Sequence, residues 1–172
     1  CFWCHNPEWQ SAKRQMGVWA DRCEGDGTCV PLCPTNALSL QNGVARRDYE
    51  RCMACGMCAR MCPHGAMEMI GWETEAGEVA ELVLREKPFF DASGGGVTIT
   101  GGEPTAQPDF LLALAKALKD EGVHVALDTC GYFNHELVPE LADVVDLFLF
   151  DLKQSDPDKQ LEGAGATNHS IL

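Results

Sequence analysis

The sequence contains the run Cys52-x-x-Cys55-x-x-Cys58-x-x-x-Cys62-Pro63, which is the most informative segment for predicting its structure. Four cysteines at this spacing are typical of bacterial ferredoxin modules. There, three close cysteines hold one iron–sulfur cluster and the fourth crosses to a second cluster. The spacing therefore indicates iron–sulfur ligation and predicts a partner run elsewhere in the chain.

A partner run lies upstream, as Cys23-x-x-Asp26-x-x-Cys29-x-x-x-Cys33-Pro34. It has the same spacing as the run at 52–62, with Asp26 at the position of the second cysteine. Because the fourth cysteine of each run serves the other cluster, we expect two crossed ligand sets. One set is Cys33, Cys52, Cys55 and Cys58, and the other is Cys23, Asp26, Cys29 and Cys62.

Structural zinc and a disulfide framework are the alternatives for so many cysteines. Zinc sites usually need two well-separated ligand pairs and no trailing Cys-Pro, so zinc is a minor alternative. Disulfides suit small secreted chains, and the sequence shows neither a signal peptide nor an apolar run of bilayer length. We therefore expect iron–sulfur clusters in the reducing cytoplasm.

The acidic charge of the chain is unevenly distributed. The 172 residues carry a formal net charge of −13. Residues 1–72 hold seven basic and seven acidic residues, whereas residues 73–172 hold six and nineteen. Because phosphate binding needs clustered cations, this balance predicts no nucleic-acid partner. We also expect no membrane partner.

Hydrophobic patterning after the cysteines predicts strands alternating with helices. We expect a hairpin over 38–47 around Gln41-Asn42-Gly43, while residues 9–22 read as a connection. The strands are expected at 67–72, 97–100, 123–128 and 144–152, and the helices at 75–87, 107–121, 134–142 and from Ser155 or Asp156 onward. Lys87-Pro88 would end the first helix, in which Val79, Leu82 and Val83 share an apolar face. In the second helix, the apolar face is made of Leu111, Leu114, Ala115 and Leu118. The apolar run 144–152 is typical of a parallel strand covered on both faces. The alternation indicates an α/β fold built from βαβ units.

Carboxylates follow three of these strands. Glu103, Asp128 and Asp151 each lie at or just past a carboxyl-terminal strand end. Parallel α/β folds build their sites at this edge. Any one of them could be a loop carboxylate or a helix cap, but three in consecutive units favour a site.

Several segments together resemble one family. They resemble radical S-adenosylmethionine (SAM) enzymes, and more narrowly the activating enzymes of glycyl radical enzymes that carry a ferredoxin-like insert. The resemblance covers essentially the whole chain. It rests on the dicluster runs and on Cys1-x-Trp3-Cys4-x-Asn6-Pro7-Glu8, Lys87-Pro88-Phe89-Phe90, Ser93-Gly94-Gly95-Gly96-Val97-Thr98 and Gly101-Gly102-Glu103-Pro104.

The resemblance implies a partial (βα)6 barrel with an inserted ferredoxin-like dicluster module. Residues 1–19 would form the loop of the radical SAM cluster, 20–72 the insert and 73–172 the barrel. The first barrel strand would precede Cys1 and two more would follow Leu172, so we expect a fragment truncated at both ends.

The family's chemistry uses a 4Fe–4S cluster held by three cysteines. Cys1 and Cys4 match the second and third cysteines of the motif Cys-x-x-x-Cys-x-x-Cys. By resemblance, the open iron binds SAM, and reductive cleavage gives a 5′-deoxyadenosyl radical that takes hydrogen from a glycine of a partner enzyme. The expected cofactors are therefore SAM and three clusters, and the Asp26 cluster could be 3Fe–4S.

Further site residues follow from the resemblance, position by position. Gly101, Gly102 and Glu103 match the motif that meets the methionine amino group, and Lys153 matches a site lysine. Cys130 matches no role, so we expect it to be a buried free thiol. Trp3 stands where an aromatic residue packs near adenine, although core packing is an equal alternative. A monovalent cation site would use Asp128, Thr129 and Asp151.

The expected partners are a glycyl radical enzyme as protein substrate and a reduced ferredoxin or flavodoxin as electron donor. Two alternatives stay open: a ferredoxin-type electron-transfer protein, and another radical SAM enzyme that modifies a peptide or a small molecule. The segment 94–104 argues against the former, because a ferredoxin needs no Gly-Gly-Glu-Pro strand.

The incomplete motif at Cys1 gives the first prediction. We expect the gene to encode a cysteine four positions before Cys1, because a cluster with one open iron needs three thiolates. Sequencing the gene upstream of this segment checks it. Any other residue at that position would contradict the radical SAM assignment of Cys1 and Cys4.

Overall fold

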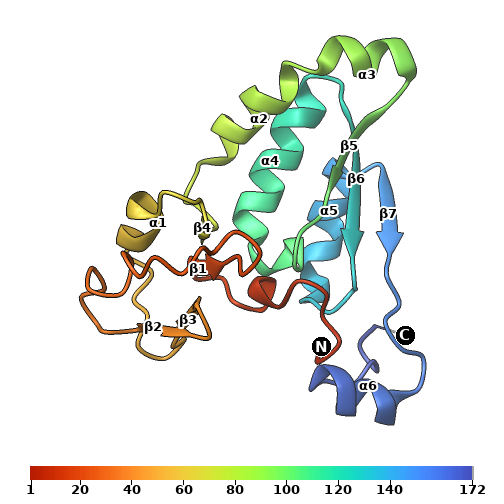
Figure 1. The fold of residues 1–172 in the computed structure, drawn as a ribbon. Helices are drawn as coiled ribbons and strands as arrows, with labels where there is room; N and C mark the ends of the chain where they lie inside the picture. The colour runs from red at the N-terminus through yellow and green to blue at the C-terminus, as the bar shows by residue number, and fades with distance from the viewer. Residues whose placement is uncertain (172) are drawn as a thin grey trace. The chain divides into compact units, whose positions relative to one another are not determined.

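The computed structural model describes residues 1–171, and their contacts divide the chain into two units. The cysteine-rich unit is Gln10–Glu73, and the sheet unit is Cys1–Trp9 together with the residues from Thr74 onward. Figure 1 shows the elements of both units in chain order. We describe each unit by itself.

The cysteine-rich unit is built from short strands and one helix. They are β1 (Gln15–Val18), β2 (Leu38–Gln41), β3 (Val44–Arg47), α1 (Met57–Met61) and β4 (Met67–Ile70). Strand β1 pairs antiparallel with β4, and β2 pairs antiparallel with β3. The interpretation of residues 9–22 as a connection was wrong for β1, because only pairing with β4 defines so short a strand.

The predicted hairpin over 38–47 is confirmed. Its turn residues Asn42 and Gly43 have φ angles of 52° and 76°. Positive φ at both central positions is the type I′ requirement, and asparagine followed by glycine meets it at low cost. The buried Leu38 and Ala45 then face a core that includes Met16 and Met67.

The sheet unit is an α/β layer structure, and the predicted fold class is confirmed. Its three strands run parallel in the order β5-β6-β7 within the described residues. The elements are α2 (Ala76–Leu84), α3 (Lys87–Ser93), β5 (Gly96–Ile99), α4 (Pro108–Asp120), β6 (His124–Thr129), α5 (Val138–Val144), β7 (Leu147–Phe150) and α6 (Pro157–Ala164). Short 3-10 helices are η1 (Pro7–Gln10), η2 (Pro104–Ala106) and η3 (His135–Leu137).

Helix α4 supplies the centre of the core in this unit. Its predicted apolar face is buried, at Leu111, Leu114, Ala115 and Leu118. These side chains pack with Val125 and Leu127 of β6 in one cluster. Burying a leucine contributes about 1.5–3 kcal/mol, so α4 holds the sheet mainly through this face.

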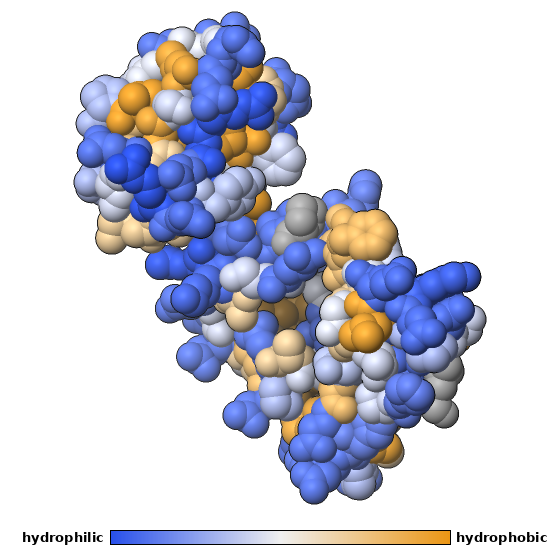
Figure 2. Space-filling view, turned by 90° about the horizontal axis from the view of Figure 1, so that it is seen from below, coloured by the Kyte–Doolittle hydropathy of each residue, from blue (hydrophilic) through white to orange (hydrophobic). Residues whose placement is uncertain are grey.

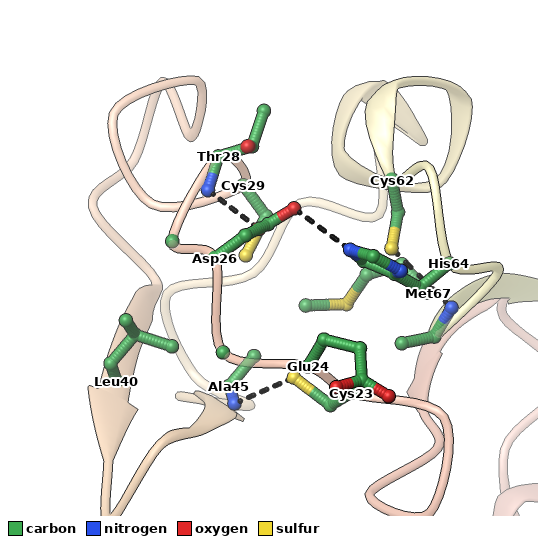
Figure 3. Close-up of a pocket in the computed structure, with 13 residues that line it drawn as sticks. Cys23, Glu24, Asp26, Thr28, Cys29, Leu40, Ala45, Cys62, His64 and Met67 are labelled. Atoms are coloured by element: carbon green, nitrogen blue, oxygen red, sulfur yellow. Dashed lines mark hydrogen bonds and ion pairs between the residues drawn. The ribbon is translucent and has the colours of Figure 1, made fainter.

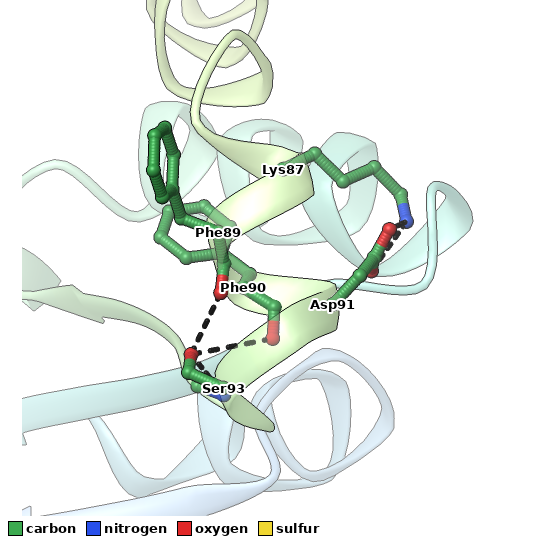
Figure 4. Close-up of polar contacts among 6 residues, drawn as sticks. Lys87, Phe89, Phe90, Asp91 and Ser93 are labelled. Carbon is green, nitrogen blue, oxygen red and sulfur yellow. Dashed lines mark hydrogen bonds and ion pairs between the residues drawn. The ribbon is translucent and has the colours of Figure 1, made fainter.

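Lys87-Pro88 begins a helix, whereas we expected it only to end one. Helix α2 stops at Leu84, and α3 starts at Lys87 with Pro88 in its first turn. Proline is tolerated there because the first turn needs no N–H partner within the helix. The Lys87 ammonium pairs with Asp91 at 2.8 Å, and the Ser93 hydroxyl donates to the Phe89 carbonyl at 2.8 Å (Figure 4).

The expectation that residues 144–152 form a strand covered on both faces was wrong for the described residues. Strand β7 is shorter, and its four side chains are 40–53% exposed. Leu82 of α2, expected on an apolar face, is also 59% exposed. Figure 2 shows separate hydrophobic patches among hydrophilic residues on the face that it draws. Hydrophobicity alone could not reveal what covers a strand.

Leu127 tests the importance of the β6 core. It is fully buried, so Leu127→Ala should lower the free energy of unfolding by about 2–5 kcal/mol through lost burial and a cavity. The exposed Leu82 provides the control, since Leu82→Ala should cost about 0.5 kcal/mol or less. Urea unfolding followed by circular dichroism measures both. Equal losses would contradict the assignment of the core.

Candidate cofactor sites

One pocket of the cysteine-rich unit gathers a predicted ligand set. Cys23, Asp26, Cys29 and Cys62 all line it, although Cys62 comes from the other run. In Figure 3, loops on two sides of the pocket carry these side chains. His64 lines the same pocket and was not predicted as a site residue.

A second pocket of this unit gathers the other set. Its lining includes Cys33 from the first run and Cys52, Cys55 and Cys58 from the second. The fold thus brings together the residues that the crossing rule grouped. Proximity is what the structure adds, while iron ligation itself stays a prediction.

Backbone N–H groups point at the sulfur atoms of both pockets. Ala45 donates to Cys23 Sγ at 3.4 Å, Ala37 to Cys33 Sγ at 3.2 Å and Ala66 to Cys62 Sγ at 3.4 Å. Such hydrogen bonds stabilise thiolates and are one of the means by which proteins set cluster potentials. Ala37 and Ala66 each lie four residues after the cysteine of a Cys-Pro pair and donate to that cysteine, so the ends of the two runs fold alike.

The thiols differ in their tendency to ionise. Burial raises the pKa of the Cys29 and Cys58 thiols, and neighbouring cysteines raise it further. For Cys33, burial acts in the same direction, but hydrogen bonds from Thr35, Ala37 and Leu38 outweigh it and lower the pKa. Buried thiolates at close quarters repel, and bound iron would remove that repulsion.

The donor set therefore fits iron–sulfur clusters. Within residues 1–171, no group of three or more His, Cys, Asp or Glu side chains converges tightly enough to hold one metal ion. A cubane cluster does not require such convergence, because each ligand binds a different iron. Thiolates spread around one pocket, with N–H donors behind them, are the arrangement that such a cluster uses.

A further candidate site, in the sheet unit, is centred on Glu103. Its carboxylate accepts from the Thr105 hydroxyl at 2.6 Å, the Thr129 hydroxyl at 2.8 Å and the Cys130 N–H at 2.9 Å. Burial opposes ionisation, yet these hydrogen bonds hold the pKa of Glu103 below its usual value. Glu103 thereby links the segment after β5 to the end of β6.

The other predicted carboxylates also lie at this edge. Thr100 donates to Asp128 at 3.1 Å, and Asp151 forms an ion pair with Lys153. The hydrogen bond to Asp151 raises the pKa of Lys153, and the charge of Asp128 also contributes. The structure therefore brings together the strand-end residues that the sequence analysis named.

Cys130 was expected to be a buried thiol, and it is only partly buried. Burial raises the pKa of its thiol, and the neighbouring Glu103 raises it further. The hydrogen-bonding residues Thr100 and Thr105 were missed. Their only sequence signal is their place directly before and after the Gly-Gly-Glu-Pro segment.

Gly101 and Gly102 allow another segment to come close. A side chain on Gly101 would lie 3.1 Å from the Trp9 ring, and one on Gly102 would lie 2.9 Å from the Trp9 carbonyl oxygen. Gly101 also has a φ of 154°, which side-chain-bearing residues rarely adopt. These glycines are therefore required by backbone packing, independently of any ligand.

The Cys1–Cys4 segment packs against α6. The Phe2 N–H donates to the Gly163 carbonyl at 2.8 Å, and the Trp3 ring lies where a Gly163 side chain would be. Trp3 is 43% exposed, so it is not a core residue. Its ring is accessible, but its contact with adenine stays a prediction.

The family model described as the Radical SAM superfamily matches residues 52–171. This chain belongs to the radical SAM superfamily. A model described as a 4Fe-4S dicluster domain matches residues 22–66. Together the two matches support SAM and iron–sulfur clusters as cofactors of this superfamily member.

The curated relatives that match are named as activating enzymes. The trans-4-hydroxy-L-proline dehydratase activating enzyme of Clostridioides difficile is 40% identical over 100% of this chain and 57% of its own length. The choline trimethylamine-lyase activating enzyme of Oleidesulfovibrio alaskensis is 38% identical, over 100% and 56%. The benzylsuccinate synthase activating enzyme of Thauera aromatica is 42% identical, over 96% and 52%.

The chain thus spans a little over half the length of these relatives. A solved domain of a pyruvate-formate lyase-activating enzyme from Bacteroides vulgatus covers 45% of this chain and 48% of its own, at 35% identity and a TM-score of 0.41, which is too low to bear on the fold. Among the described residues, none of the helices has the length and apolar character needed to cross a membrane.

Thr129 tests the hydrogen bonds at Glu103. Thr129→Val removes a buried donor, so the unfolding free energy at neutral pH should fall by about 1–3 kcal/mol. A carboxyl with a lowered folded pKa stabilises the fold above its unfolded pKa and loses that contribution in acid. The deficit of the variant should therefore shrink as the pH falls through the pKa of Glu103. Denaturant titrations at neutral and acidic pH measure this.

The matched control is Thr98→Val, on the exposed side of β5. It should change stability little at either pH. A deficit for Thr129→Val that is the same at both pH values would contradict the hydrogen bond to the charged Glu103.

Proposed function

We propose that this chain is part of an activating enzyme that cleaves SAM reductively and installs a glycyl radical on a partner enzyme. The supporting observation is its similarity, along its whole length, to several relatives that are named activating enzymes. In this proposal, the two cysteine pockets would hold electron-carrying clusters, and the strand ends around Glu103 would form part of the SAM site.

The SAM site would be built at the carboxyl-terminal edge of the sheet. Cys1 and Cys4 would hold the radical SAM cluster, whose bound SAM supplies a 5′-deoxyadenosyl radical on reduction. Gly101 and Gly102 would present backbone to the methionine amino group. Glu103 would keep that backbone in place through its bonds to the end of β6.

Charged residues at the same edge would complete this site. Asp128, Thr129 and Asp151 would hold a monovalent cation near the SAM carboxylate. Lys153, already paired with Asp151, would add positive charge. Opposed carboxylates are stable together only with such partners.

The cysteine-rich unit would carry electrons to the SAM site. Two clusters would occupy the crossed ligand sets, with Asp26 completing one of them. A carboxylate is a harder ligand than a thiolate, so the Asp26 cluster would be prone to lose one iron and become 3Fe–4S. A reduced ferredoxin or flavodoxin in the cytoplasm would be the electron donor.

Activity of the product of the whole gene tests this function. The reconstituted and reduced protein should convert SAM to 5′-deoxyadenosine and methionine, and should produce a glycyl radical signal on its partner. Cys4→Ala should abolish both results, because it removes a cluster ligand. Glu103→Ala should weaken SAM binding at least about tenfold and leave the iron of the cysteine-rich unit unchanged. Unchanged SAM affinity would contradict the role of Glu103.

The crossed sets give a further prediction. Cys29→Ala and Cys62→Ala should disrupt the same cluster although they lie in different runs, while Cys33→Ala should disrupt the other. Iron analysis with electron paramagnetic resonance of the reduced clusters distinguishes the two. Loss of one cluster by Cys29→Ala and of the other by Cys62→Ala would refute the crossing.

A further inference from the structure

His64 is a polar side chain of the Asp26 pocket to which the predicted ligand set assigns no role. It lies two residues after Cys62, on the turn that follows Pro63. Its imidazole Nε2 lies 3.2 Å from Asp26 Oδ2, across the pocket from the loop that carries Asp26. Figure 3 shows the two side chains pointing toward one another.

Asp26 makes a polar contact through each of its carboxylate oxygens. The Thr28 N–H donates to Oδ1 at 3.0 Å, and His64 approaches Oδ2. Together these contacts fix the plane of the carboxylate, which otherwise rotates about two side-chain bonds. Each oxygen keeps a second lone pair, so a held carboxylate can still bind iron.

The Asp26 position differs from the cysteine positions in exposure as well as in chemistry. The side chains of Asp26 and His64 are 38% and 37% exposed, whereas Cys29 is 7% exposed. An oxygen ligand at the accessible side of a sulfur-lined pocket is the weakest point of a cluster. Hydrogen bonds behind metal-binding carboxylates typically change metal affinity by about 10–100-fold.

We propose that His64 is a positioning residue for Asp26, and that the contact of its Nε2 with Oδ2 keeps the carboxylate on one iron of the cluster. The inference rests on the proposed ligand set. The four cage positions are filled by three cysteines and Asp26, so His64 acts through Asp26 and does not bind iron. The contact determines how readily this cluster changes between 4Fe–4S and 3Fe–4S.

The change itself is a defined redox step. Ferricyanide takes one electron from the cluster in its 2+ state and is reduced to ferrocyanide. The resulting 3+ cluster releases one Fe²⁺, which leaves a 3Fe–4S cluster with a charge of 1+. Release requires Asp26 to part from that iron, and this is the step that His64 slows.

The rate of this step tests the inference in the full chain. Cys1→Ala and Cys4→Ala form the background, so that only clusters of the cysteine-rich unit contribute. After anaerobic reconstitution, both proteins are treated with stoichiometric ferricyanide. The 3Fe–4S cluster should form about tenfold faster in the His64→Leu variant than in the protein that keeps His64. His64→Gln retains an N–H donor and should restore a slow rate. Freeze-quenched electron paramagnetic resonance follows the signal.

An Asp26→Cys background provides the matched control. A thiolate in place of the carboxylate needs no such support, so His64→Leu should not alter the rate there. In the protein that keeps Asp26, equal rates with and without the His64→Leu substitution would overturn the proposal. So would an equal acceleration in both backgrounds, since His64 would then act on the pocket as a whole.

Two further readouts separate this inference from the ligand set on which it rests. Nitrogen couplings typical of an iron-bound imidazole would overturn it, because His64 would then be a ligand. In the background with Cys1→Ala and Cys4→Ala, iron analysis should give about eight iron atoms per chain, as expected for the two cubane clusters of the cysteine-rich unit. About four iron atoms would refute the Asp26 cage itself, whereas eight iron atoms with unaffected rates would refute only the role of His64.

Discussion

The cysteine-rich unit depends on a single constraint: the last cysteine of each run must reach the pocket of the other run. Cys62 lines a pocket with Cys23 and Cys29, and Cys33 lines one with the second run. The pairing of β1 with β4 and the hairpin β2–β3 hold the two runs in this relation. The small core around Met16 and Met67 is thus built to support the thiols.

In the sheet unit, charged side chains lie together at one edge of a parallel sheet. Glu103 accepts hydrogen bonds from its own turn and from the end of β6, so it acts as a connection within the protein. Asp151 and Lys153 neutralise one another at the end of β7. These contacts allow several charged groups to lie together in a site without large repulsion.

The predictions from the sequence differ most from the structure where the conformation or exposure of a segment depends on residues far away in the chain. Strand β1 has only four residues and is recognised through its pairing with β4. Lys87-Pro88 breaks one helix and starts the next, and proline is compatible with either event. The apolar β7 was expected to be covered, yet its exposure depends on which segments pack over it. His64 carried no spacing signal, since it matches no position of the cysteine runs.

The α/β class and the carboxylates at the strand ends follow from the sequence alone, and so does the prediction of iron–sulfur clusters in two crossed ligand sets. Each of these depends on local spacing. The clusters follow from the spacing of the cysteines, the α/β class from hydrophobic repeats such as that of α4, and the carboxylates from their position directly after a strand. Tertiary structure decided which groups actually touch. Glu103 with Thr129 and Asp26 with His64 are contacts between residues 26 and 38 positions apart, and no local pattern specifies the distance between such pairs. Only the folded packing of loops brings them within hydrogen-bond reach.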